Sequence, residues 1–300
     1  MKAEMETANV WPGLPLKEWQ DTYSTLHMWT QIVGKIRLTQ TPLINHYWNS
    51  TLYVTSRGLT TSSMPYGTRI FEINFDFIDH RLNLLCSDGS SASLPLAQKS
   101  VADFYGELMT KLRQLSIDVH INAKPDEVAE PIPFAEDHKH ASYDPEYANR
   151  FWRILLQTDR VFQKFRSKFI GKCSPVHFFW GSFDHAVTRF SGRRAPERPG
   201  ADAITREAYS HEVISHGFWP GAGSTEALFY SYSAPAPPGL EKEPISPGFY
   251  SSEMSEFILP YEDVRKAASP DDVLLSFMQS TYEAGARLAN WNRAELERQD

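Results

Sequence analysis

The sequence predicts an α+β fold made of a duplicated unit, in which a helix, three antiparallel strands and a second helix occur twice. Two segments carry this prediction: PLINHYWNSTLYVTSRG, from Pro42, and PVHFFWGSFDHAVTRFSG, from Pro175. They share a proline, a histidine, a Trp-x-Ser and a Val-Thr in the same order. Such self-similarity indicates an internal repeat, unless it is a coincidence among common strand residues. A repeat predicts two halves related by pseudo-twofold symmetry.

The elements of the first half follow from local patterns. Residues 22–38 have the apolar spacing of an amphipathic helix, and strand-like runs follow the repeated segment at 68–78 and 81–87. A Leu-Pro-Leu turn at 94–96 then leads into a second helix. The links between these strands are too short for parallel crossovers, so we expect antiparallel pairing.

The second half repeats this order. A helical pattern over 146–169 precedes the repeated segment, and strand-like runs follow at 227–234 and 255–264. The last helix is expected to begin after Ser269 as N-cap, with Pro270 in the first helical position. The domain boundaries that follow are an N-terminal tail at 1–16, a first repeat at 17–123, a linker rich in proline and acid at 124–144, a second repeat at 145–292 with an insertion at 191–223, and a C-terminal tail at 293–300. Both tails are expected to be loosely held.

Composition excludes several classes of protein. The chain has 30 basic and 37 acidic residues and a net charge of −7, which argues against a nucleic-acid-binding surface. No stretch is apolar enough for a signal peptide or a membrane span, so we expect a cytoplasmic protein that engages neither nucleic acid nor membrane. Cys86 and Cys173 are expected to be reduced thiols. No dinucleotide, nucleotide-triphosphate, hydrolase-elbow or calcium motif occurs, and the cofactor, if any, is unknown.

The repeated segment of the second half carries the first candidate site residues. Trp48 and Val54 are six positions apart, whereas Trp180 and Val187 are seven apart, which predicts a β-bulge near Gly181. A bulge shifts the side-chain alternation, so that His177 shares a face with Ser182 and Asp184. His177 and Asp184 would then face one cavity. The alternative is that His177 packs at the start of the strand and Asp184 faces solvent.

The insertion after this strand is the main difference between the halves, and function often concentrates in long ordered loops. We expect a helix over residues 202–219. HEVISH, at 211–216, resembles a zinc motif, but two histidines five apart are rotated by about 140° on a helix and cannot share one metal. Helical spacing instead pairs Glu212 with His216, and His211 with Ser215. The alternative is a solvated helix with incidental polar residues.

Arginines and aromatic residues complete the candidate site. Arg189, Arg193, Arg194 and Arg198 cluster in an acidic protein, which suits a carboxylate or phosphate if they point inward, or a solvated loop if they do not. Trp180, Phe218 and Trp219 either line an apolar pocket or hold the insertion against the sheet. His138 and His140 indicate a surface metal site or, more simply, a solvated loop.

Together these residues predict a protein that binds, and in the stronger form of the hypothesis transforms, a small anionic molecule in a pocket of the second half. His177 or His216 would be the general acid or base, and Asp184 or Glu212 the orienting carboxylate. Anion and wall contacts would come from Arg189, Arg193, Trp180, Ser182 and Trp219. In a variant of the hypothesis a metal is held by His177, Asp184 and His211. The competing hypothesis is a non-catalytic interaction or scaffold protein, with a homodimer as one form.

Three segments also carry a resemblance: HFFWGSFDHAVTRFSGR, SHEVISHGFWPG and FILPYEDVRKAASPDDVLLSFMQSTYEAGARLANW. Through them the chain resembles, from Trp11 to Glu297, a bacterial family of uncharacterised proteins classed as a domain of unknown function. The resemblance implies no activity, cofactor or catalytic residue.

Overall fold

A twelve-stranded antiparallel sheet organises the computed structural model, which describes residues 10–299. The strand order is β11-β12-β10-β9-β8-β7-β1-β2-β4-β5-β6, and β3 pairs with β4 outside this path. The strands are β1 (Thr51–Val54), β2 (Gly58–Thr60), β3 (Met64–Tyr66), β4 (Arg69–Asp76), β5 (Arg81–Cys86), β6 (Ser91–Pro95), β7 (His177–Phe179), β8 (Asp184–Arg194), β9 (His211–Trp219), β10 (Leu228–Ala234), β11 (Phe249–Ser251) and β12 (Glu256–Pro260).

The two halves of the chain meet at β1 and β7, where Thr51 pairs with Phe179 and Leu52 with Phe178. The first half supplies all strands on one side of this junction and the second half all strands on the other. The mixed helix and sheet fold and its antiparallel pairing are confirmed. Three strands per half is wrong, because 91–95 and 211–219 also form strands.

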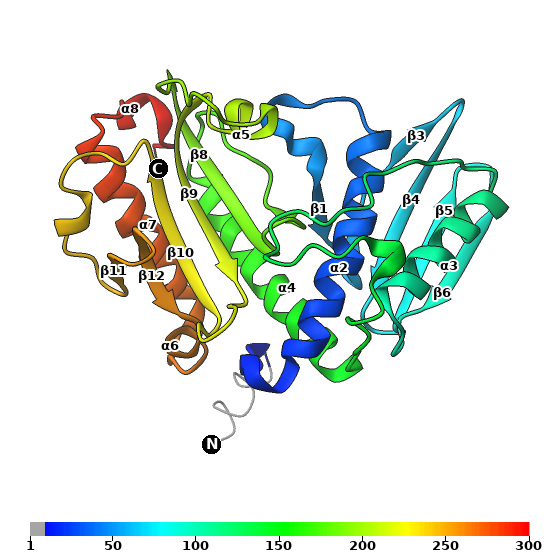
Figure 1. The fold of residues 1–300 in the computed structure, drawn as a ribbon. Coiled ribbons are helices and arrows are strands. Elements are labelled where there is room, and N and C mark those ends of the chain that lie inside the picture. Colours follow the sequence, from blue (N-terminus) through cyan, green and yellow to red (C-terminus); the bar gives the residue numbers. More distant parts are fainter. Residues whose placement is uncertain (1–9, 300) are drawn as a thin grey trace.

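Four long helices cover the sheet: α2 (Leu16–Gln40), α3 (Val101–Gln114), α4 (Pro145–Ser167) and α7 (Pro270–Leu288). Figure 1 shows α4 and α7 behind β8, β9 and β10, while α3 lies in front of β5 and β6. Two starts have clear local causes. Ser100 accepts a hydrogen bond from the Asp103 N–H, and Asp144 caps α4 by accepting from the two N–H groups that follow Pro145. The predicted start of α7 at Pro270 is confirmed.

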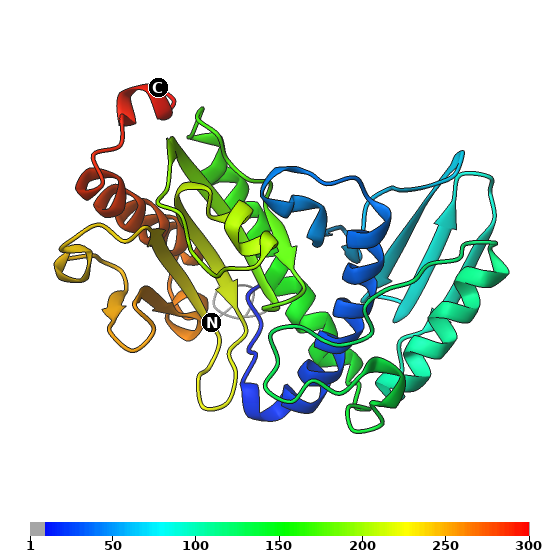
Figure 2. The same cartoon turned by 45° about the horizontal axis from the view of Figure 1, so that its top comes forward.

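The remaining helices are short: α5 (Ala203–Ala208), α6 (Tyr261–Arg265), α8 (Arg293–Leu296), and the 3-10 turns η1 (Asn45–Ser50), η2 (Phe134–Glu136) and η3 (Leu240–Lys242). In Figure 2, α5 lies over the face of β8 and β9 that α4 leaves uncovered. Among residues 10–299 no helix has both the length and the apolar character needed to cross a membrane. The cytoplasmic location stays a prediction.

Aromatic residues dominate the core between the sheet and the helices. Phe151 of α4 stacks on Phe183 and meets Phe178 of β7 edge-on, and Trp29 of α2 stacks on Phe104 of α3. Each fully buried ring of this kind contributes about 1.5–3 kcal/mol relative to an exposed one. The core therefore joins helices of both halves to the junction of the sheet.

The ends of the described chain are not loose, contrary to the prediction. Trp11 is 1% exposed and Leu14 is also buried, because both pack into the core beside Tyr261 and Phe229. At the other end, residues 293–296 form α8, and Glu297 bridges to Phe169. Residues 1–9 and 300 of the predicted tails lie outside the described residues.

The bulge predicted at Gly181 is also wrong, since a tight hairpin occupies this place. Residues 180–183 form the turn, and Phe179 pairs with Asp184 across it. Gly181 lies against Glu127, whose carboxylate leaves no room for a Cβ. His177 and Asp184 still share a face, because residues directly opposite in an antiparallel ladder point to the same side.

The helix predicted over 202–219 exists only as α5, at Ala203–Ala208. HEVISHGFW is strand β9, which pairs with β8 and β10 and lies inside the sheet. A short run containing Val213 and Ile214 fits both the period of a helix and the period of a strand. It forms a strand because it is buried between two neighbouring strands. The insertion therefore supplies an inner strand of the second half.

Candidate functional site

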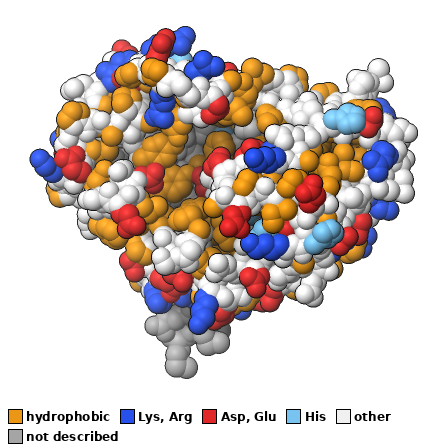
Figure 3. Space-filling model, in the orientation of Figure 1, with side chains coloured by type: hydrophobic (Ala, Val, Ile, Leu, Met, Phe, Trp, Pro, Cys, Tyr) orange, Lys and Arg blue, Asp and Glu red, His pale blue; other side chains and the backbone are white. Residues whose placement is uncertain are grey.

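A groove of about 990 Å³ lies on the face of β8, β9 and β10 opposite α4 and α7. η1 and α5 form one wall, and Asp126 and Glu127 from the segment between the halves form another. Figure 3 shows a hollow with a hydrophobic floor and acidic side chains beside it. The alternation of the strands sends Asp184, Ala186 and Thr188 into the groove, and the residues between them toward the helices.

Asp184 is the most buried charged group of the groove, at 7% exposure. Its carboxylate accepts hydrogen bonds from the Ser182 hydroxyl, at 2.6 Å, and from the Tyr230 hydroxyl. Burial raises the pKa of Asp184, and these two donors offset part of that rise. Nothing cationic among residues 10–299 forms an ion pair with Asp184, so the buried carboxylate has only neutral donors.

Further carboxyl groups surround Asp184. Burial and the charge of Asp184 raise the pKa of Glu256 to about 7, and the same causes, with Asp126, raise the pKa of Glu127. Asp202 lies on the α5 side, and Asp126 pairs with Lys35 at 2.5 Å. Of the described residues that line the groove, five are acidic and none is a lysine or arginine. The groove is strongly electronegative.

Aromatic rings form most of the groove's remaining wall. They come from η1, from the β7–β8 hairpin, from β8, from the residue that follows α5, and from β9 and β10: Trp48, Phe179, Trp180, Phe190, Tyr209, Trp219, Tyr230 and Tyr232. Tyr230 and Tyr232 stack with centroids 6.0 Å apart. Glycines leave room for two of these rings, since Gly34 faces Trp180 and Gly217 faces Tyr230. The site combines carboxylates with flat apolar surface.

Four residues predicted from the sequence line this groove: Asp184, Ser182, Trp180 and Trp219. His177 lies on the same face but is fully buried, and it meets Phe179 and Trp48 edge-on. Both ring nitrogens of His177 lack a hydrogen-bond partner, and burial lowers its pKa to about 3. His177 therefore does not reach the groove and is a neutral core residue.

Two predicted residues lie on the opposite face of the sheet, among the helices. Arg189 is 1% exposed, with its guanidinium carbon 3.4 Å from the centroid of Phe165, and burial lowers its pKa to about 10. His216 lies 3.0 Å from the Thr281 hydroxyl, and burial lowers its pKa to about 3. Neither residue can contact a ligand in the groove.

Glu212 and Arg193 pair with each other near the end of the sheet, at 2.7 Å, away from the groove. Arg193 also donates to the carbonyl of Ala289 at the end of α7, which stabilises that helix terminus. His211 lines a different pocket, beside α5. The predicted constellation of His177, Asp184, Arg193, His211 and Glu212 is therefore divided among several places.

The metal variant of the prediction fails for the same reason. Within residues 10–299 no group of three or more His, Cys, Asp or Glu side chains is arranged to hold a metal ion. His140, in the segment between the halves, donates from its Nδ1 to the buried carboxylate of Asp137 at 2.7 Å. That contact anchors the loop.

Sequence reasoning missed Glu127, Tyr230 and Glu256. Tyr230 belongs to the alternating run LFYSYSA, whose period of two is the signal that could have placed its two tyrosines on one face. The two glutamates carry no local signal, because tertiary packing brings them to Asp184 from a connecting segment and from β12.

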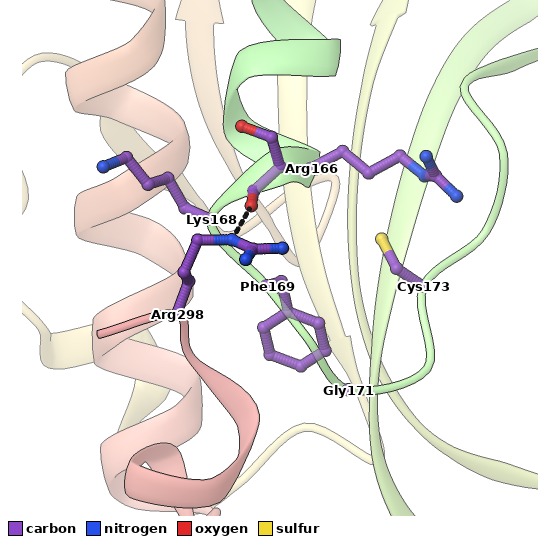
Figure 4. A pocket seen from close by; sticks show the side chains of 7 residues that line it. Arg166, Lys168, Phe169, Gly171, Cys173 and Arg298 are labelled. Atoms are coloured by element: carbon purple, nitrogen blue, oxygen red, sulfur yellow. Dashed lines mark hydrogen bonds between the residues drawn. The ribbon is translucent and has the colours of Figure 1, made fainter. Parts of the chain in front are cut away.

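Two smaller pockets are basic. One, of about 500 Å³, lies where α4 ends and contains Arg166, Lys168, Arg298, Phe169 and Cys173. Figure 4 shows the side chains of Arg166 and Arg298 on either side of the Phe169 ring. Both guanidinium Nε atoms donate to backbone carbonyls, of Ser174 and Ser167 respectively. The other basic pocket, beside α5, contains His211.

The fold and the groove define a mixed helix and sheet protein with an open cavity on its central strands. The model of a family of unknown function (DUF5996) matches residues 11–298, so the chain belongs to that family. The resemblance seen in the sequence is confirmed. No curated protein and no solved structure matched the chain. The family has no known activity, and the site must be interpreted from its own chemistry.

Proposed function

We propose that the protein binds a small organic cation, an amine with an apolar or aromatic body, in the groove over β8, β9 and β10. The observation that carries this proposal is Asp184, a buried carboxylate at the groove floor with neutral donors and no cationic partner among the described residues. A buried charge without a counter-ion is costly, and a bound ammonium group would supply the missing one.

The surrounding carboxyls support the same ligand class. Burial and the charge of Asp184 raise the pKa values of Glu127 and Glu256, that of Glu256 to about 7, so Glu256 is partly protonated near neutral pH. A cation bound among them would favour the ionised forms and lower those pKa values. At 4 Å a unit charge pair contributes about 4 kcal/mol at an effective dielectric constant of 20. Binding should therefore release protons.

The aromatic wall supports the apolar part of the ligand. Rings such as Trp180, Trp219 and Tyr230 attract a cation placed over their faces by about 0.5–2 kcal/mol, depending on how far it is desolvated. They also cover an apolar body. The sequence predicted a small anion as the ligand. In this groove an anion would meet five acidic side chains and no lysine or arginine, so the groove does not suit it.

The test is a calorimetric titration of the full chain with phenethylamine, tyramine and choline, and with phenethyl alcohol as the neutral counterpart of the first. We expect saturable binding of an amine and none of the alcohol. Asp184→Asn should abolish binding, since asparagine keeps the size and still accepts from Tyr230. Asp88→Asn, an exposed carboxylate of the β5–β6 turn, is the matched control and should bind normally. Equal binding of the amine and the alcohol would contradict the proposal. Amine binding by Asp184→Asn equal to that of the parent protein would also contradict it.

We also infer that the two halves descend from a duplicated unit. Reading outward from β1 and β7, the orders are β1-β2-β4-β5-β6, with β3 beside β4, and β7-β8-β9-β10-β12-β11, and each half is preceded by a long helix and followed by another. The equal number of strands supports a duplication more strongly than the sequence similarity does, because β9 is then the counterpart of β4 in the other half. Separate sequence profiles of residues 17–123 and 145–292, built across the family, should align in this register, and failure to do so would contradict the inference.

A further inference from the structure

The second basic pocket, of about 600 Å³, lies between η1, α5, the end of β8 and the start of β9, with Lys172 from the segment before β7. Its cationic side chains are Lys172, Arg194 and Arg206, and its one acidic side chain is Glu207. This balance is the reverse of the neighbouring groove, which has five carboxyls and no lysine or arginine. In a chain of net charge −7, three cations at one pocket favour a negatively charged partner.

His46 fixes one wall of this pocket. It is buried, its Nδ1 lies 2.9 Å from the carbonyl of Glu207, and its Nε2 lies 2.6 Å from the Lys172 Nζ. A carbonyl only accepts, so Nδ1 carries the hydrogen and Nε2 accepts from the ammonium group. One of the three N–H groups of the Lys172 ammonium therefore donates to His46, and the other two remain for a ligand.

Glu207 offsets the cations only in part, because it carries a single negative charge and its effect on the pKa of Lys172 is smaller than that of burial. Its Oε1 accepts from the backbone N–H of His46 at 3.0 Å. Arg194 and Arg206 form no ion pair with any residue of the range 10–299, although carboxylates are abundant elsewhere on this chain. Burial lowers the pKa of Lys172, and the adjacent Lys172 lowers that of both His46 and His211 in addition to burial. Three basic side chains thus share one carboxylate here.

The backbone of this wall is unusual as well. His46 and Tyr47 are consecutive residues in the left-handed region, with φ of 59° and 56°. Each such non-glycine residue costs about 1–3 kcal/mol and persists only where its surroundings hold it, as they often do at ligand sites. Here the surroundings are the hydrogen bonds from His46 to α5, which orient the ring toward Lys172.

We propose that this pocket binds a small oxyanion, a phosphate or carboxylate group, through Lys172, Arg194 and Arg206. The anion would accept from the Lys172 ammonium and from the two guanidinium groups, with the open nitrogen of His211 as a further donor once protonated. His46 is a positioning residue, because it acts through Lys172.

The oxyanion site is separate from the amine site. Asp184 and Arg194 are the two ends of β8, whose register shifts between Phe190 and Arg194. The groove and this pocket adjoin at His46, which lines both, but they share no other lining residue, so the groups that would bind the amine and the oxyanion are different. The proposal therefore does not rest on the proposed function, and either can fail without the other.

The experiment is a titration of the full chain with inorganic phosphate at low ionic strength, with sodium acetate and sodium chloride in parallel at matched ionic strength. We expect saturable binding of phosphate or acetate but not chloride, and the better of the two identifies the oxyanion. Arg206→Gln should weaken binding at least about fivefold, the effect of removing one partly exposed charged contact. Arg206 is exposed and contributes nothing to the core, so this variant is expected to fold.

Two control variants make the outcome decisive. Arg298→Gln removes the same charge from the other basic pocket and should leave phosphate or acetate binding unchanged. Asp184→Asn should also leave it unchanged. Ring resonances of His46 and His211 should move on titration, and those of the buried His177 should not. Absence of saturable binding, or equal weakening by Arg206→Gln and Arg298→Gln, would overturn the oxyanion site while leaving the amine site untouched.

Discussion

The hydroxyl of Tyr230 donates a hydrogen bond to Asp184, although the two residues lie on β10 and β8 with β9 between them. Tyr230 is paired with Gly217 of β9, and its ring crosses directly over that glycine. A side chain at position 217 would occupy the path of the ring. The hydrogen bond from Tyr230 to the buried carboxylate of Asp184 thus depends on Gly217 in β9.

Gly217→Ala should displace Tyr230 and remove a donor from Asp184. We expect weaker amine binding and a free energy of unfolding lower by about 1–3 kcal/mol, from overpacking and a lost hydrogen bond. Urea denaturation and calorimetry measure the two effects. The matched control is Gly106→Ala in α3, where a Cβ meets nothing and the better helix propensity of alanine should stabilise by up to about 1 kcal/mol. A destabilised Gly106→Ala together with a neutral Gly217→Ala would refute this account.

Amine affinity should rise with pH across the range around 7. Burial and the charge of Asp184 raise the pKa of Glu256 to about 7, so this carboxyl is neutral below that pH and ionised above it. A cation binds the ionised form better, and affinity is lost as pH falls through that value. Titrations between pH 5.5 and 8.5 measure the trend, on the order of one proton released per amine.

Glu256→Gln is the variant that isolates this effect. It should bind the amine more weakly at pH 8 and show a flatter pH dependence, since no charge then appears at position 256. An unchanged slope in Glu256→Gln would assign the titration to another carboxyl, Glu127 being the next candidate.

The protein should lose stability in acid because of its buried histidines. Burial lowers the pKa of His177 and His216 to about 3 and that of His27 to about 4. In the unfolded chain each takes up a proton below about pH 6.5, whereas in the folded chain it does not, so each costs about 1.4 kcal/mol per pH unit between these limits. Stability is therefore fully retained above about pH 6.5 and falls as pH decreases toward 3.

His177→Phe tests that statement at one position, because both nitrogens of His177 are unpartnered and its neighbours are aromatic. The free energy of unfolding, measured by urea at pH 7 and pH 5, should fall less steeply in this variant than in the parent protein. The same variant should leave amine binding intact, in contrast to the role predicted from the sequence. Loss of binding with retained stability would restore His177 to the site.

Arg189 should matter for stability and not for binding. Its guanidinium is packed against Phe165 and Tyr282 and donates to the carbonyl of Phe165. Arg189→Ala should cost about 2–5 kcal/mol through the cavity left behind, whereas Arg189→Met, of similar length, should be close to neutral or stabilising. Thermal or urea unfolding measures both. Impaired amine or phosphate binding in the well-folded Arg189→Met variant would contradict this assignment.

The long helices and strands of this fold follow from local sequence patterns. Helical spacing over 146–169 and the cap before Pro270 predicted α4 and α7, since a helix longer than three turns shows its period unambiguously. The runs at 68–78 and 227–234 likewise predicted β4 and β10. Ser182 and Asp184 were placed on one face by the alternation expected after a bulge that is not present, whereas Trp180 and Trp219 were chosen as aromatic side chains that could line a pocket.

The remaining features depend on packing between segments that are far apart in the chain. Whether HEVISHGFW is a helix or a strand depended on its neighbours β8 and β10, since nine residues fit both periods. The sign of the groove's charge depended on Glu127 and Glu256, which come from a connecting segment and from β12. Of the arginines that predicted an anion, Arg189 lies in the core and Arg193 at the end of α7, whereas Arg194 lines the basic pocket beside α5. Sequence spacing records which side a residue faces, whereas the partners that set its charge and pKa are brought there by packing over long chain distances.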